Sequence, residues 1–249
     1  MPRYFIEVAY KGTAYSGFQV QENANSIQAE VEKALTIFFR KDFSLTGSSR
    51  TDAGVHALQN FFHFDADTEL EDAAYHLNAI LPAGIAVRRL FRVPDQLHCR
   101  FDALSREYCY YIYQHKDPFA ADRAFFYPYK IDLAQLNAAA AIVKEYSDFT
   151  SFSKRNTQVK TYECRIEESE WIVQPNGMYY HVRANRFLRG MVKGLVGTML
   201  QVGRGKWSLD DFHAVIRAKD ATRADFAVPS QGLFLVQVEF APLPGVFGK

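Results

Sequence analysis

The first hundred residues alternate between segments typical of strands and segments typical of amphipathic helices. Residues 3–10 (RYFIEVAY) are rich in aromatic and β-branched side chains, which predicts a strand. The helix predicted next has a capping pattern formed by Asn25 and Gln28, followed by apolar residues at helical spacing up to Phe38. We expect further strands near 43–47 and 58–65, a helix near 69–80 and a strand at 85–93.

The remaining residues repeat this order. Residues 106–113 (REYCYYIY) predict a strand, and Asp132 with Gln135 caps a helix whose apolar stripe reaches Val143. Strands are predicted near 162–173 and 178–184, joined by a hairpin turn at Pro175-Asn176-Gly177. Helices near 186–202 and 208–218 and a strand at 232–240 complete the chain.

Both halves therefore have the order β-α-β-β-α-β, the split βαβ arrangement of ferredoxin-like domains. We predict an α+β protein with an N-terminal half of residues 1–105 and a C-terminal half of residues 106–249. Each half would form an antiparallel sheet with helices on one face. Two such sheets side by side would leave a central cleft, and the loop around Asp52 would overhang it.

Composition places the chain among ordinary globular proteins, since 48% of its 249 residues are apolar and 23% are charged. The longest apolar region, residues 187–202, contains Arg189 and Lys193 and is too short and too charged to span a bilayer. No basic-plus-apolar signal segment opens the chain. We therefore expect a cytoplasmic protein without a membrane partner.

Neither cysteine nor histidine is spaced as in a metal site. Cys99, Cys109 and Cys164 are scattered without a CxxC pair, and the seven histidines show no metal-ligand spacing. We expect reduced core thiols, and neither a disulfide framework nor a zinc site.

Charge is unevenly distributed along the chain. The net charge of +1 argues against a general polyanion binder, but residues 1–105 have a net charge of −3 and residues 106–249 a net charge of +4. Residues 182–206 carry six basic side chains and no acidic one. Such a run is typical of a solvated face or of a site for phosphates, and the pattern leaves both open.

The polar stretch TGSSRTDAGVHALQN, residues 46–60, holds a single carboxylate, Asp52. A tight connection between strands would explain its glycines and hydroxyl side chains. A Ser-Asp-His hydrolase site made of Ser49, Asp52 and His56 is a weaker alternative, because triad members normally come from separate segments. A third hypothesis is a lone carboxylate that acts as nucleophile and is held ionised by cationic side chains.

Cations for such a carboxylate could come from the C-terminal half. Arg186, Arg189 and Lys193 recur at i, i+3 and i+7, which would place them on one face of the helix predicted at 186–202. A basic surface beside a core stripe is the structural alternative. The opposite stripe is apolar and is expected in the core: Phe187, Met191, Leu195 and Met199.

Tyrosines gather on the strand at residues 106–113. Alternation places Tyr108 and Tyr110 on the same face as Arg106. Tyrosines in strands commonly pack in a core, and the functional alternative is a platform on which unpaired RNA bases stack.

Residues 50–57 (RTDAGVHA) resemble the active-site motif of the tRNA pseudouridine synthase A family, whose members isomerise uridines 38 to 40 in the anticodon stem-loop of tRNA. The resemblance runs the length of the chain. It also includes residues 10–13, 17–19, 26–28, 32–35, 86–88, 101–103, 106–110, 148–152, 187–192 and 232–235.

The resemblance implies the pseudouridine synthase fold and a reaction without a metal, nucleotide or redox cofactor. Asp52 would be the nucleophile, attacking C1′ of the sugar or C6 of the base. Tyr108 would pack against the target base, and Arg50 would hold the space that the flipped uridine leaves. The resemblance also implies a homodimer, with the basic helix carrying Arg186 acting partly across the interface on tRNA.

Three positions depart from the family pattern. Phe18 replaces a tryptophan that is usual there, and residues 47–49 (GSS) replace a glycine-rich segment. Lys193 stands where an arginine is common and lacks the planar two-pronged grip on a carboxylate. Either Lys193 or Arg189 could therefore be the partner of Asp52. A non-catalytic RNA-binding protein with the same scaffold is the competing hypothesis.

Overall fold

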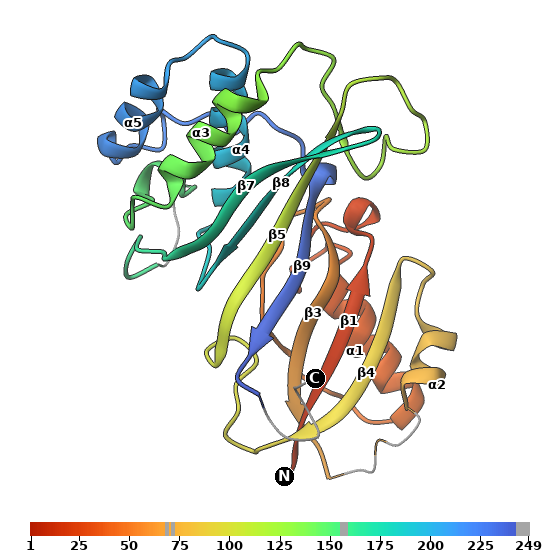
Figure 1. The fold of residues 1–249 in the computed structure, drawn as a ribbon. Coiled ribbons are helices and arrows are strands. Elements are labelled where there is room, and N and C mark those ends of the chain that lie inside the picture. The colour runs from red at the N-terminus through yellow and green to blue at the C-terminus, as the bar shows by residue number, and fades with distance from the viewer. Residues whose placement is uncertain (68–69, 71–72, 155–158, 243–249) are drawn as a thin grey trace. The chain divides into compact units, whose positions relative to one another are not determined.

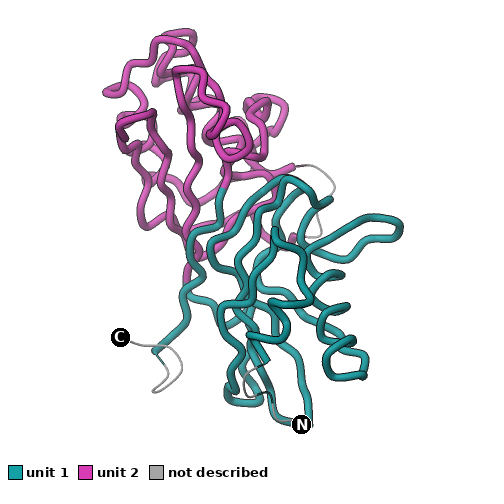
Figure 2. The backbone as a smooth tube through the Cα atoms, turned by 90° about the vertical axis from the view of Figure 1, so that its right-hand side faces the viewer, with its two compact units in different colours: residues 1–104, 234–249 teal, residues 105–233 magenta. Residues whose placement is uncertain are grey.

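The computed structural model describes residues 1–67, 70, 73–154 and 159–242. Two units, coloured separately in Figure 2, comprise residues 1–104 with the segment from Phe234 on, and Ser105–Leu233. The boundary at residue 104 lies one position from the predicted one. The units differ from the predicted halves at the last strand, most of which is counted with the first unit.

The first unit is a sheet with two helices packed against it (Figure 1). Strand β1 pairs antiparallel with β3 and β4, the short β2 pairs antiparallel with β3, and β9 pairs parallel with β3. The order β-α-β-β-α-β predicted for the N-terminal half is confirmed. Its elements are β1 (Arg3–Tyr10), α1 (Ile27–Phe39), β2 (Thr46–Gly47), β3 (His56–Asp65), α2 (Ala73–Ile80) and β4 (Ile85–Val93), to which β9 (Leu233–Phe240) is added.

Helix α1 begins after Ser26, whose side chain accepts a hydrogen bond from the Ala29 backbone N–H at 3.3 Å. The predicted cap at Asn25 is therefore wrong by one residue. The side chain of Asn78 connects α2 to β4, because it bonds both the N–H and the carbonyl of Val87 at 2.8 Å. Residues 69, 71 and 72 of the helix predicted near 69–80 lie outside the described residues.

The second unit is an antiparallel sheet of β5, β8 and β7 with helices on one face (Figure 1). Asn137 of α3 exchanges hydrogen bonds with the backbone of Trp171 on β7 at 2.8 and 3.2 Å. The predicted hairpin is confirmed, since Gln174 pairs with Gly177. Its elements are β5 (Ala103–Tyr113), β6 (Phe125–Phe126), α3 (Leu133–Val143), β7 (Ile166–Gln174), β8 (Gly177–Ala184), α4 (Met191–Gly203) and α5 (Leu209–Ala218).

The helix predicted to start near residue 186, α4, instead begins at Met191. Gly190 adopts a φ of 77° at the N-cap, a left-handed conformation that interrupts any helix arriving from residue 186. Arg186 and Arg189 therefore precede the helix, and the predicted common helical face with Lys193 is wrong. The apolar stripe is confirmed within the helix, where Met191, Leu195 and Met199 are fully buried.

Helices and mainly antiparallel strands make this an α+β fold, as predicted. Within the described ranges, no helix has the length and apolar character that a bilayer crossing needs. The side-by-side arrangement of the two predicted halves around a central cleft stays a prediction.

Candidate active site

The loop between β2 and β3, residues 48–55, is tied to the strands beneath it by a buried network. Asn60 of β3 accepts from the Ser49 N–H at 3.3 Å and donates to the Ser49 carbonyl at 2.8 Å. Its amide also donates to the Tyr10 hydroxyl at 3.1 Å, and that hydroxyl lies 2.8 Å from Thr51 Oγ1. The carbonyl of Thr51 accepts from the Phe18 N–H at 3.1 Å. The backbone on either side of Thr51 is thereby held in place.

A tight turn follows at residues 52–55. The Val55 N–H donates to the Asp52 carbonyl at 3.2 Å, and Gly54 in the third position has a φ of 79°. A type II turn requires a positive φ at that position, which glycine adopts without steric cost. The predicted tight connection is therefore present.

Side chains of this loop divide into buried and projecting ones. Thr51, Val55 and His56 are buried, whereas Asp52 is partly exposed and Arg50 is exposed. Two of the predicted site residues, Arg50 and Asp52, thus project from the same anchored loop. A carboxylate in such a position can reach a bound ligand while its backbone stays fixed.

A Ser-Asp-His hydrolase site is not assembled in this loop. Ser49 Oγ is buried and makes no hydrogen bond to any residue in the described part of the chain. His56 Nδ1 accepts from the Gly12 N–H at 3.3 Å, and its ring stacks on Phe234 with centroids 4.4 Å apart. The serine–histidine contact that a triad requires is therefore missing.

In the second unit, the two tyrosines predicted to share a face of β5, Tyr108 and Tyr110, have different neighbours. Tyr110 is fully buried and its hydroxyl donates to the Pro229 carbonyl at 2.7 Å; burial raises the pKa of this phenol. It belongs to the core and cannot stack on a base. Tyr108 is also buried, with 8% of its surface exposed, and lies edge-on to Phe187, with ring centroids 5.0 Å apart at 82°. Its ring is thereby oriented by the segment that leads into α4.

The basic residues of the second unit lie on that same segment and on α4. Arg186 is partly exposed and lies close enough to Cys164 to oppose the burial that raises the pKa of this thiol to about 11. Arg189 is exposed, and its carbonyl accepts from the Lys154 N–H at 2.9 Å. Lys193 Nζ donates to Ser230 Oγ at 3.2 Å. Pairing of Asp52 with Arg189 or Lys193 stays a prediction.

Comparisons with known proteins agree with the motif of the loop. A family model described as tRNA pseudouridine synthase matches residues 6–102 and 146–241. The chain belongs to the tRNA pseudouridine synthase family. It is an enzyme of the isomerase class, and its match to the family includes Asp52 and the Arg186–Lys193 segment, whereas Tyr108 lies between the matched ranges.

Relatives that align over almost the whole chain are named tRNA pseudouridine synthase A. Proteins named tRNA pseudouridine synthase A from Parabacteroides distasonis and Bacteroides fragilis are 42% and 45% identical, and each alignment covers 96% of both chains. The protein of that name from Staphylococcus carnosus is 34% identical, with 96% of this chain and 91% of the relative covered.

The enzyme has further polar side chains close to the loop that sequence patterns did not single out. A pocket of about 320 Å³ in the first unit is bordered by Arg50 and by residues from three other segments. Its lining is Phe18, Gln19, Gln28, Leu45, Thr46, Gly47, Arg50, His98, Arg100 and Phe101. The run His98-Cys99-Arg100-Phe101 just after β4 was the available sequence signal.

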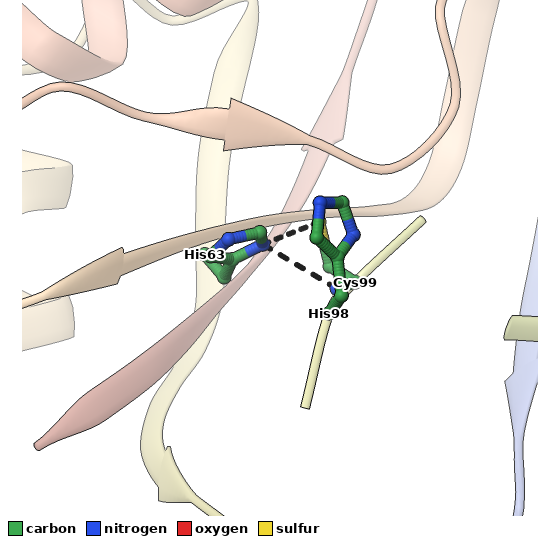
Figure 3. A group of neighbouring side chains, drawn as sticks. All are labelled: His63, His98 and Cys99. Carbon is green, nitrogen blue, oxygen red and sulfur yellow. Dashed lines mark hydrogen bonds between the residues drawn. The ribbon is translucent and has the colours of Figure 1, made fainter. Parts of the chain in front are cut away.

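His63, His98 and Cys99 form a cluster beside this pocket (Figure 3). Their nitrogen and sulfur atoms, which are ligand types of zinc, lie within 4.8 Å of one another. The Cys99 thiol lies 3.2 Å from both the Thr46 carbonyl and His63 Nδ1 and is hydrogen-bonded to them. A metal ion would have to displace these bonds. Sequence spacing could not reveal the cluster, because β3 and the segment after β4 contribute its members.

Proposed function

We propose that this enzyme converts uridine to pseudouridine at positions 38, 39 and 40 in the anticodon stem-loop of tRNA. Family membership and relatives named tRNA pseudouridine synthase A support the reaction and the substrate class. The observation that carries the proposal is the position of Asp52, a partly exposed carboxylate on a loop whose neighbouring residues are buried and hydrogen-bonded.

Asp52 is the proposed nucleophile. Its carboxylate attacks either C1′ of the sugar or C6 of the base, and the bond between N1 and C1′ breaks. The uracil then turns so that C5 bonds to C1′, the bond to Asp52 breaks and frees its carboxylate, and the proton on C5 is lost while N1 gains one. Atoms balance within the nucleotide, so the proposed reaction uses no metal, nucleotide or redox cofactor.

The target uridine has to leave its stack before Asp52 can reach it, at a cost of a few kcal/mol. Arg50 is proposed to hold the space that the base vacates, and Tyr108 to pack against the flipped base. Arg186, Arg189 and Lys193 are proposed to contact RNA phosphates, one of them also serving as the partner of Asp52. Binding of this kind weakens steeply with salt.

We further propose that the enzyme acts as a homodimer in the cytoplasm, with one tRNA spanning both subunits. Sedimentation of the purified protein with and without tRNA tests this directly. A single species with the mass of one chain at micromolar concentration, active at full rate, would contradict the dimer.

Substitution Asp52→Asn tests the nucleophile. The change keeps the size of the side chain and removes the reactive oxygen anion, so the rate should fall by at least about a thousandfold. Release of tritium from tRNA labelled at C5 of uridine measures turnover, and filter binding measures the affinity for tRNA, which should change little.

Asp42→Asn is the matched control, since Asp42 is an exposed carboxylate of the same unit. It should release tritium at the wild-type rate. Binding of tRNA without tritium release by the unsubstituted protein would favour a non-catalytic RNA-binding protein and overturn the proposal.

A further inference from the structure

We propose that the pocket bordered by Arg50 and His98 binds a second nucleotide of the RNA, distinct from the target uridine. The nucleotide's phosphate would contact Arg50, Arg100 and His98, and its base would stack on Phe101. This inference rests on the proposed function, because it takes the ligand to be tRNA. The pocket belongs wholly to the first unit and has a volume of about 320 Å³.

The charge of the pocket suits an anion. Arg50 and Arg100 contribute two guanidinium groups, both on exposed residues. None of the lining residues in the described part of the chain carries a carboxylate. Two acidic side chains bond the lining. Asp102 Oδ2 accepts from the His98 N–H at 2.6 Å, and Glu32 Oε1 accepts from the Gln28 amide and the Leu45 N–H, both at 2.9 Å. Arginine forks match phosphate oxygens in geometry as well as in charge.

His98 presents a third donor. Its Nδ1 accepts from the backbone N–H groups of Arg100 and Phe101 at 3.1 and 3.4 Å. A neutral imidazole that accepts at Nδ1 carries its hydrogen on Nε2. Burial and the nearby Arg3 lower the pKa of His98, which favours this neutral donor form at pH 7. The ring can therefore donate one hydrogen bond to a phosphate oxygen.

Phe101 supplies the apolar surface that a base needs. Its side chain is 76% exposed, although a phenylalanine gains stability from burial. One contact is the His98 ring, at 4.2 Å between centroids with 37° between the planes; the Arg100 guanidinium lies 5.9 Å from the Phe101 ring. An exposed aromatic ring beside a cation is an arrangement on which proteins stack unpaired bases.

The segment that carries these side chains is held in place before any ligand binds. Cys99 is fully buried and is hydrogen-bonded to Thr46 and His63, as Figure 3 shows for His63. The His98 N–H donates to Asp102 Oδ2 at 2.6 Å. Little conformational entropy is then lost on binding, which favours affinity.

Two substitutions test the pocket. Phe101→Ala removes the stacking surface and should raise the Kd for an unmodified tRNA transcript by about 5- to 100-fold. Arg100→Gln removes a phosphate contact and should reduce the slope of log Kd against log salt by about 1. Filter binding at several salt concentrations measures both, and thermal unfolding shows whether each variant is folded.

Matched controls carry the same substitutions elsewhere. Phe119→Ala changes a ring that is 84% exposed, and Arg88→Gln changes an exposed arginine of β4; neither side chain lines the pocket. Both should bind tRNA within about twofold of the wild type. If Arg100→Gln unfolds, Phe101→Ala decides the question alone.

The outcomes separate this inference from the proposed function. If the wild type releases tritium but Phe101→Ala binds tRNA as tightly as Phe119→Ala, the pocket is not an RNA site and the function stands. If the wild type releases no tritium, the function fails, and the Kd values still decide whether the pocket binds RNA. Inorganic phosphate that competes with tRNA equally in Arg100→Gln and wild type would also overturn the phosphate contact.

Discussion

Individual side chains of the 48–55 loop either hold its backbone in place or project from it. Thr51 in the loop and His56 at the start of β3 face inward and hold the backbone through Tyr10 and Gly12, while Arg50 and Asp52 project. Residues 50–52 thus alternate between projecting and buried side chains. A change at an inward position should therefore reach catalysis through the placement of Asp52.

Asn60→Ala tests that connection. The buried amide of Asn60 bonds both the N–H and the carbonyl of Ser49 and also the Tyr10 hydroxyl, and its loss leaves those groups unsatisfied. We expect the free energy of unfolding to fall by about 1–3 kcal/mol, and the single-turnover rate to fall more than tRNA affinity. Urea unfolding and tritium release measure the two effects.

Leu58→Ala is the control on the same strand, since that side chain is 51% exposed. It should leave both quantities nearly unchanged. Equal rates in Asn60→Ala and Leu58→Ala would show that the network does not position Asp52.

The sequence could single out Arg50 and Asp52 as candidate site residues because both lie in one contiguous motif. It could not identify Asn60 and Tyr10 as their supports, since the two residues are 50 positions apart and meet only when β1 and β3 pair. His98 was missed for the same reason, and Phe101 entered only through the family resemblance of residues 101–103, as the pocket exists only after four segments converge.

Elements are linked by the cluster of His63, His98 and Cys99, which joins β3 to the segment after β4. Burial, with His98 and Arg3 nearby, lowers the pKa of His63 to about 4, while Asp65 acts in the opposite direction. An unfolded histidine titrates near 6.5. Between these values the unfolded chain binds a proton that the folded chain does not.

Stability should therefore fall as the pH is lowered from about 6.5 to about 4, and His63→Gln should lessen that fall. Urea midpoints at pH 7 and pH 5 measure the difference. His115→Gln, at an exposed histidine, is the control and should keep the wild-type dependence. If the stability of His63→Gln fell between pH 7 and pH 5 as much as that of the wild type, His63 would be excluded as the source of the pH dependence.

The boundaries of helices and strands were predictable where the pattern of apolar residues and the backbone conformation agree. Strand β4 occupies residues 85–93 as predicted, because its residues suit a strand throughout. Helix α4 starts five residues after the predicted position. The apolar stripe includes Phe187 and therefore indicated an earlier start, but the left-handed backbone at Gly190 prevents a continuous helix from residue 186. Periodicity reports which side chains are apolar and does not report a backbone interruption.

At the scale of the whole molecule, β9 is placed in the first unit although it follows the entire second unit in the chain. Phe240 at its end lies edge-on to Phe5 and Phe61, with ring centroids 5.5 and 5.2 Å apart. The Val238 N–H donates to Gln59 Oε1 at 3.0 Å. The core of the first unit is thus completed by residues more than a hundred positions away.

Phe240→Ala should lower the free energy of unfolding by about 3–5 kcal/mol, because it opens a cavity between β1 and β3. Phe119→Ala, at an exposed ring, should change it by less than about 0.5 kcal/mol. Urea unfolding followed by circular dichroism distinguishes them. Similar midpoints for the two variants would mean that β9 contributes little to the first unit.

The α+β class could be predicted from the alternation of strand and helix segments along the chain. The parallel pairing of His56 with Phe234 could not, because nothing in either local pattern indicates a partner so far away. The last strand was therefore predicted with the C-terminal half, whereas most of it is counted with the first unit.

The order of synthesis affects when β9 can join the first unit. About 140 residues separate the end of β4 from the start of β9, so a ribosome needs roughly 7–30 s to reach β9 after β4 is complete. During that interval β3, which leads directly out of the Asp52 loop, lacks its parallel neighbour. A nascent chain would thus complete the unit that carries Asp52 only after the whole second unit has been synthesised.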